Sequence, residues 1–307
     1  MKKEKSPGAM KKFIKKMAIA VLTGAIAFSV VPATVQAAGW KQNKNGYWWQ
    51  ENDYSYPRNQ WKTIYGKQYH FNSSGYMDTG WKKIDGKWYY LGGKNDGAKK
   101  TYWQKVYGKY YWLGNDGAMR TGWQRVYNKY YWLGSSNDGA MKTGWQKVYG
   151  KYYWLGNNGD MKTGWQTVYG KKYYLGGAND GAMKTGWQTI DGKKYYLGND
   201  GAMKTGWQQV YGKWYYLGSA EDGSMKTYWQ QINGKWYFFG GADDGAMKTG
   251  WQQLGGQWYY LNGSGEMTTG WQAVGGRWYY MGSNGVMYAN TWTPDGRYVD
   301  GSGAWVQ

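Results

Sequence analysis

The chain has 307 residues, a formal net charge of +20, no cysteine, 51 glycines and an aromatic content of 21%. The absence of cysteine excludes disulfides and metal sites built on thiolates. The positive charge favours anionic partners, and the glycines indicate frequent turns.

Residues 1–37 predict an export signal. A basic region at 11–16 precedes an apolar run at 17–31, and Val35-Gln36-Ala37 offers a small-residue cleavage site. An apolar run of this length is short for a membrane span. We therefore expect a secreted protein with no membrane attachment after cleavage.

One unit of 20 or 22 residues recurs from residue 61 to residue 291, and residues 205–217, TGWQQVYGKWYYL, are a clear copy. Each copy opens with a tryptophan that we call the anchor. The anchors are Trp61, Trp81, Trp103, Trp123, Trp145, Trp165, Trp187, Trp207, Trp229, Trp251 and Trp271. A period near 20 is typical of an array in which each unit buries its face on its neighbours. Residues 38–60 form a degenerate N-terminal capping repeat, 61–291 the array proper, and 292–307 a C-terminal cap.

Each unit predicts a β-hairpin. Asp85-Gly86 separates two short apolar and aromatic runs, and this dipeptide favours a type I′ turn. Asp191-Gly192 and Asn233-Gly234 repeat the signal, while Tyr-Gly and Gly-Gly fit less well. The predicted fold is an all-β solenoid of stacked short hairpins, with about 11 repeats and degenerate repeats at the ends.

A two-residue turn fixes the register and the two faces of each hairpin. It pairs Trp81 with Tyr90 and Lys83 with Trp88, so Trp81, Trp88 and Tyr90 share one face. This face is nearly all aromatic. The other face is mixed and is the predicted core; it carries Ile84, Tyr89 and Leu91.

The aromatic face varies along the chain at the position seven residues after the anchor. It holds a second tryptophan in five repeats, a tyrosine in three and a lysine, Lys172 or Lys194, in two. The anchor spacings alternate between 20 and 22 residues, with one slip between Trp229 and Trp251. The array is therefore chemically uneven.

No pattern for an enzyme is present. The sequence lacks G-x-S-x-G, H-E-x-x-H and P-loop motifs, and its single histidine, His70, replaces a repeat aromatic as a surface or packing residue. The recurring loop aspartates are turn formers. We expect no enzyme activity, no cofactor and no metal.

Walls of tryptophan and tyrosine suit a quaternary ammonium, which ring quadrupoles attract, or a sugar ring stacked on indoles. A teichoic acid that carries phosphocholine would offer phosphates to the lysines and choline to the rings. Two alternatives stay open: an α-glucan or other polysaccharide binder, and a structural spacer or adhesin subunit whose aromatics are only core.

The unit T-G-W-Q-x-V-x-G-K-W-Y-Y-L…D-G-x-M resembles the choline-binding, or cell-wall-binding, repeats of Gram-positive surface proteins, which are related to glucan-binding repeats. The resemblance covers residues 39 to about 305. It implies a protein held non-covalently on the cell wall, by choline-bearing teichoic acid or wall glycan, with no nucleic-acid partner. Choline would sit between consecutive hairpins in an aromatic cage, often beside a methionine.

Carried over by position, the resemblance implies cages built on pairs of tryptophans, each closed by an aromatic residue of the next repeat. The candidate pairs are Trp207 with Trp214, Trp229 with Trp236, Trp251 with Trp258, Trp81 with Trp88, and Trp271 with Trp278. The third walls of the first three pairs would be Phe238, Tyr260 and Tyr280. Lys172 and Lys194 depart from the pattern and would repel choline.

Overall fold

The structure, a computed structural model, describes residues 37–306. They contain strands and no helix, so the predicted all-β class is confirmed. The strands are β1 (Gly39–Asn43), β2 (Gly46–Gln50), β3 (Gln60–Ile64), β4 (Lys67–Phe71), β5 (Trp81–Ile84), β6 (Lys87–Tyr90), β7 (Tyr102–Val106), β8 (Lys109–Leu113), β9 (Trp123–Val126), β10 (Lys129–Trp132), β11 (Gly144–Val148), β12 (Lys151–Leu155), β13 (Trp165–Val168), β14 (Lys171–Tyr174), β15 (Gly186–Ile190), β16 (Lys193–Leu197), β17 (Gly206–Val210), β18 (Lys213–Leu217), β19 (Tyr228–Ile232), β20 (Lys235–Phe239), β21 (Gly250–Leu254), β22 (Gln257–Leu261), β23 (Gly270–Val274), β24 (Arg277–Met281), β25 (Thr291–Trp292) and β26 (Tyr298–Val299).

Consecutive strands pair into two-stranded antiparallel hairpins in the register that the turns predict. In the hairpin of β17 and β18, Trp207 lies opposite Tyr216, and Gln209 lies opposite Trp214. The turn residue Tyr211 has φ 49° and Gly212 has φ 80°, so Tyr-Gly adopts the same left-handed turn as Asn233-Gly234. The hairpin sheets stay separate and do not close into a barrel.

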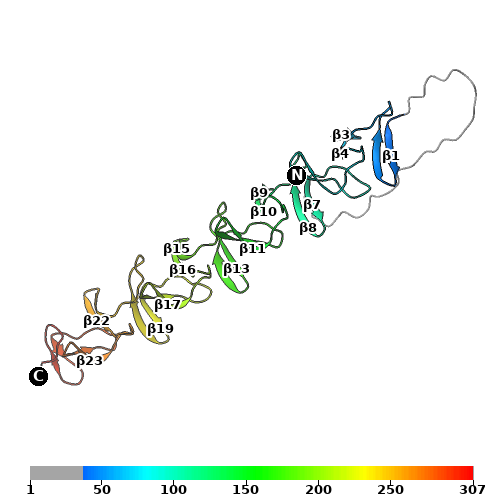
Figure 1. Cartoon of the computed structure of the whole chain (residues 1–307). Coiled ribbons are helices and arrows are strands. Elements are labelled where there is room, and N and C mark those ends of the chain that lie inside the picture. Colours follow the sequence, from blue (N-terminus) through cyan, green and yellow to red (C-terminus); the bar gives the residue numbers. More distant parts are fainter. Residues whose placement is uncertain (1–36, 307) are drawn as a thin grey trace, which may run out of the picture. The chain divides into compact units, whose positions relative to one another are not determined.

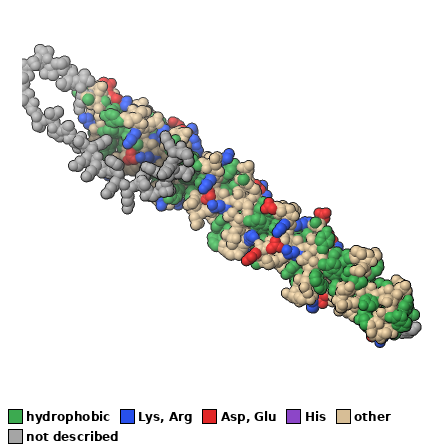
Figure 2. Space-filling view, turned by 180° about the vertical axis from the view of Figure 1, so that it is seen from behind, with side chains coloured by type: hydrophobic (Ala, Val, Ile, Leu, Met, Phe, Trp, Pro, Cys, Tyr) green, Lys and Arg blue, Asp and Glu red, His purple; other side chains and the backbone are tan. Residues whose placement is uncertain are grey.

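The described residues divide into two compact units, one of residues 37–82 and 91–99 and one of residues 83–90 and 100–306. In the second unit the hairpins follow one another in chain order, and the labels β7 to β23 trace this succession (Figure 1). Figure 2 shows hydrophobic side chains at the surface between basic and acidic ones.

A short connector after each loop joins neighbouring hairpins of the second unit. The backbone N–H of Met247 donates to the carbonyl oxygen of Trp214 in one hairpin at 2.8 Å. The next N–H, of Lys248, donates to the carbonyl oxygen of Phe238 in the following hairpin at 2.8 Å. Two-stranded hairpins are marginal alone, and these bonds hold each one to its neighbour.

The core of the second unit lies on the face predicted for it. Val210, Tyr215 and Leu217 are buried and cluster with Ala246, while Trp187 of the preceding hairpin packs against them. Leu217 is fully buried, as are the leucines ten residues after several other anchors. Burial of such side chains against neighbouring hairpins and their connectors is the main apolar contribution to the stability of the fold.

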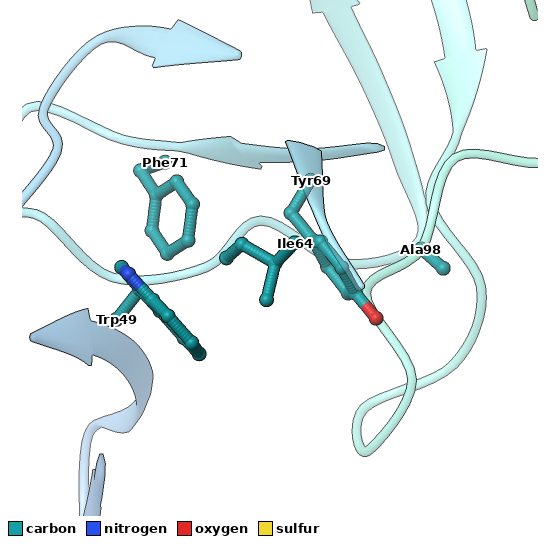
Figure 3. Close-up of a cluster of buried hydrophobic side chains, with 5 residues drawn as sticks. All are labelled: Trp49, Ile64, Tyr69, Phe71 and Ala98. Carbon is teal, nitrogen blue, oxygen red and sulfur yellow. The ribbon is translucent and has the colours of Figure 1, made fainter. Parts of the chain in front are cut away.

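The first unit has a core of its own, drawn in Figure 3. Trp49 of β2, Ile64 of β3, and Tyr69 and Phe71 of β4 are buried together with Ala98. The predicted packing of His70 is also found here, because its Nδ1 lies 2.7 Å from Oδ2 of the buried Asp78.

Residues 37–306 contain no helix long and apolar enough to cross a membrane. The predicted export signal, apart from Ala37, lies outside the described residues, and it stays a prediction.

Candidate functional site

One candidate site is an open box of aromatic rings that we call the Trp207 cage, made of Trp207, Trp214, Tyr237 and Met247. The ring centroids of Trp207 and Tyr237 are 4.9 Å apart with the planes at 68°, and those of Trp207 and Trp214 are 6.4 Å apart at 80°. These rings border a hollow of ≈ 400 Å³. Gly263 and Ser264 complete its lining.

Two further cages repeat this geometry. In the Trp229 cage, Trp236 lies 6.4 Å from Trp229 at 84° and Tyr259 lies 5.1 Å away at 62°. The hollow of ≈ 390 Å³ is also lined by Met267, Ser283 and Asn284. In the Trp251 cage, Trp258 lies 6.2 Å from Trp251 at 87° and Tyr279 lies 4.8 Å away at 74°. Met287 holds the place of Met247, because its N–H donates to the carbonyl oxygen of Trp258 at 2.8 Å.

The folding of each hairpin explains the box. The anchor and the residue seven positions later point to the same face, so their rings stand side by side on one hairpin. The tyrosine comes from the opposite face of the next hairpin. The outer tryptophans stay accessible, with Trp214 exposed by 43% and Trp236 by 41%. A ligand can therefore enter from solvent.

Aromatic faces rather than charges dominate the Trp207 cage. No ionisable group other than the phenol of Tyr237 lines its hollow in the described part of the chain. Burial raises the pKa of the Tyr237 phenol, and the nearby carboxylate of Glu266 raises it further, so the ring stays neutral. Such a site attracts a cation mainly through ring quadrupoles and dispersion.

The predicted third walls are misplaced by one residue. Phe238 lies opposite Trp229 on its own hairpin, with the ring centroids 5.2 Å apart, whereas Tyr237 reaches the Trp207 cage. Tyr260 and Tyr280 likewise lie beside the anchors of their own hairpins, Trp251 and Trp271. Successive side chains of a strand point to opposite faces, so the residue before each predicted wall faces the preceding hairpin and the predicted wall itself does not.

The remaining predicted pairs have different outcomes. The ring of Trp271 does not face a following tyrosine; its centroid lies 6.3 Å from that of Trp305. The backbone N–H of Trp305 donates to the carbonyl oxygen of Trp278 at 2.8 Å. Trp81 belongs to the first unit and Trp88 to the second. That pair stays a prediction.

The repeats with tyrosine seven residues after the anchor form a more polar version of the site. Trp145, Tyr152, Tyr173 and Met183 border a hollow of ≈ 280 Å³ whose lining is completed by Asn199 and Asp200. The ammonium of Lys147 lies 5.4 Å from the ring centroid of Tyr152. This site offers hydrogen-bonding groups that the Trp207 cage lacks.

The sequence contains a signal for the tyrosine walls. A tyrosine stands eight residues after every one of the eleven anchors, from Tyr69 to Tyr279, whereas the next position varies. The same arrangement occurs in the first unit, where Trp40 lies 4.8 Å from Tyr69 and the N–H of Met77 donates to the carbonyl oxygen of Tyr47 at 2.7 Å. This capping repeat was not among the predicted sites.

Residues 37–306 bring together no group of three or more His, Cys, Asp and Glu side chains that could hold a metal ion.

Comparison with known proteins places the repeats of this chain in a family. Residues 59–102, 184–228 and 248–292 match the model of the choline-binding repeat, and residues 101–119, 143–161, 163–183 and 227–247 match that of the cell wall binding repeat. No curated protein sequence matches the chain.

Solved structures of Streptococcus pneumoniae proteins give the same result. CbpJ of strain TIGR4 is 32% identical over 80% of this chain and 99% of its own, with a TM-score of 0.60. Choline-binding protein F is 35% identical over 81% of this chain and 98% of its own, with a TM-score of 0.57. A structure of that protein in complex with ipratropium is 33% identical over 81% of this chain and 98% of its own, with a TM-score of 0.55. The chain therefore belongs to the choline-binding repeat family.

Proposed function

We propose that this chain attaches to the bacterial cell wall by holding choline groups of wall polymers in the Trp207, Trp229 and Trp251 cages. It binds without catalysis, and its export depends on the predicted signal in residues 1–37. The single observation that carries the proposal is the box of aromatic rings, which the chain builds three times in succession.

The chemistry of the box favours a quaternary ammonium over a sugar. A trimethylammonium group has no N–H to satisfy, so a lining of rings and one methionine leaves no ligand group unpaired. A sugar brings several hydroxyl groups, and their burial without partners is costly. The Trp207 cage offers little beyond Ser264 and backbone to accept them. Ipratropium, which is bound in the structure of choline-binding protein F, also carries a quaternary nitrogen.

Avidity allows several weak sites to hold the chain firmly on a wall polymer. A single cage with a millimolar Kd supplies about −4 kcal/mol, and several cages on one chain can raise the overall affinity by roughly 10²–10⁴-fold. The net positive charge of the chain adds long-range attraction to an anionic polymer such as a teichoic acid.

A second function is favoured for the Trp145 site alone. Asn199, Asp200 and the phenol of Tyr152 place hydrogen-bonding groups beside an indole, and this combination suits a hydroxylated ring. A wall glycan is therefore the candidate ligand there.

The test is a titration of the full chain with choline chloride, followed by tryptophan fluorescence and by Tm. The control ligand is 3,3-dimethylbutan-1-ol, in which a neutral carbon replaces the nitrogen of choline, and sodium chloride matches the ionic strength. We expect saturation in the millimolar range with choline and at least about tenfold weaker binding of the alcohol, because the ring quadrupoles contribute roughly 0.5–2 kcal/mol per contact.

Equal affinity for the two ligands would show that the cage selects only an apolar shape. A flat response to choline, together with retention of the protein on immobilised dextran or wall glycan, would replace choline by a polysaccharide as the main ligand.

A further inference from the structure

Trp165 and Trp187 are two of the anchor tryptophans that have a lysine of this chain over their rings. Lys172 Nζ lies 5.3 Å from the ring centroid of Trp165, and Lys194 Nζ lies 5.7 Å from that of Trp187. Both lysines stand seven residues after the anchor, where Trp214 stands in the Trp207 cage. Both are half-buried, whereas the residue before each of them is exposed.

The other walls of these two sites are intact. Tyr195 lies 5.0 Å from Trp165, and the N–H of Met203 donates to the carbonyl oxygen of Lys172 at 2.8 Å. The site of Trp187 has the same two elements, Tyr215 at 4.9 Å and Met225 bonded to the carbonyl oxygen of Lys194 at 2.7 Å. Only the second tryptophan has been exchanged, and its replacement carries a positive charge.

The far end of each lysine is held by a loop 49 residues further on. Lys172 Nζ donates to the carbonyl oxygen of Glu221 at 3.0 Å, and Lys194 Nζ donates to that of Asp243 at 3.1 Å. Each loop follows the second hairpin downstream, as does the loop of Ser264 that lines the Trp207 cage. Each ammonium therefore joins its anchor ring to the segment that forms the opposite wall.

The slip in the repeat spacing fits this arrangement. Regular alternation would give a short loop after Trp229, but the spacing from Trp229 to Trp251 is again 22 residues. The longer loop contains Asp243 at the same place that Glu221 has in the preceding loop. Both lysines thus find an equivalent carbonyl oxygen.

We infer that Lys172 and Lys194 are internal ligands, whose ammonium groups fill the cages of Trp165 and Trp187 and close them to external cations. The same attraction that would hold a trimethylammonium group holds each lysine. The filled cage becomes a clamp between a hairpin and the second one after it. Only the number of choline sites rests on the proposed function.

Arginine closes the last cage in the same way. The guanidinium carbon of Arg297 lies 5.4 Å from the ring centroid of Trp271 and 5.1 Å from that of Trp305. Asp295 fixes this arrangement, because it accepts a hydrogen bond from Trp271 Nε1 at 2.9 Å and pairs with Arg297 Nε at 3.6 Å. The three open cages are consequently flanked along the chain by filled ones.

Acetylation of the lysines of the full chain tests the clamps without any choline. The amine-reactive reagent is used in limiting amount, and the modified positions are mapped by fragment mass spectrometry. The matched controls are Lys171 and Lys193, which precede the two lysines on the opposite face and are exposed, with only long ion pairs of 3.5 Å and 3.7 Å to Asp200 and Asp222. We expect Lys172 and Lys194 to react about tenfold more slowly, as partly desolvated cation–π contacts imply. Saturating choline should change neither rate.

Equal rates for each lysine and its neighbour, or a clear rise with choline, would overturn the inference. A variant gives the second readout: Lys172→Trp should add one choline equivalent in equilibrium dialysis, while Lys171→Trp should add none. If the unaltered chain binds choline and Lys172→Trp adds no site, the lysine is not what closes the cage, and the inference fails. If the unaltered chain binds no choline but the two lysines remain protected, the internal ligands stand and only the proposed function falls.

Discussion

The turn residue Tyr211 should be replaceable by asparagine with a gain in stability. Its φ of 49° is left-handed, where a tyrosine is strained, and its side chain is exposed by 88%. No ring contact involves Tyr211 in residues 37–306. Asparagine is enriched several-fold over other residues in this region, and Asn233 occupies the same turn position at φ 51°.

The comparison residue is Tyr149, which has the same φ of 49° but lies edge-on to Trp132 with the ring centroids 5.9 Å apart. A several-fold preference corresponds to about 0.5–1 kcal/mol of conformational free energy. An edge-to-face aromatic contact is worth about 0.5–1.5 kcal/mol. Tyr211→Asn should therefore stabilise its hairpin by roughly 0.5–1 kcal/mol, whereas Tyr149→Asn should give no net gain.

Native-state hydrogen exchange of the strand amides in β17 and β18, and in β11 and β12, measures these local opening free energies separately. Each variant is compared with the unaltered chain at the same hairpin. A loss of protection in Tyr211→Asn, or an equal gain in both variants, would refute the reasoning from turn strain.

Two further predictions concern the cage walls and the loops. The first uses a chain whose other two open cages are blocked by Trp236→Lys and Trp258→Lys. In this background Tyr237→Leu should weaken choline binding at the Trp207 cage by roughly 2–30-fold, because one ring wall is lost, whereas Phe238→Leu should weaken it by less than about twofold. Calorimetric titration measures both affinities, and a larger effect of Phe238→Leu would restore the assignment made from the sequence. The pKa of Asp222 is lowered by its hydrogen bond from Lys226, and that of Asp244 by its bond from Lys248. A carboxyl pKa that is lower in the folded state stabilises the fold above the ordinary aspartate pKa, and this stability should be lost as the pH falls below about 4 and through the folded-state pKa. The Tm of Asp222→Asn should therefore fall less steeply with acid than the Tm of the unaltered chain. Identical slopes would count against a stabilising bond between Lys226 and Asp222.

The local architecture could be predicted because each hairpin depends on its own residues. Asp191-Gly192 and Asn233-Gly234 mark the turns, and alternation then assigns every side chain to a face. The placement of Trp207 and Trp214 on one face and of Leu217 on the other follows from that register alone.

The relation between hairpins could not be predicted in the same way. Alternation says that Tyr237 and Phe238 face opposite sides, but which side meets the preceding hairpin depends on the connector bonds of Met247 and Lys248. The lysines pose the same problem. Their charge predicts that choline is excluded, but the contact of Lys172 with Glu221 spans 49 residues, and no local pattern encodes it.

Each hairpin serves three sites at once, and this sharing affects how such a gene can change length. The hairpin of β21 and β22 gives Trp251 and Trp258 to its own cage and Tyr259 to the preceding one, while Ser264 after it lines the cage before that. In-frame duplication of one unit therefore adds a complete site, since the neighbours already supply the missing walls. Recombination between units that carry a second tryptophan can lengthen or shorten the array in the same way, whereas a unit inserted between Lys172 and Glu221 would break their contact.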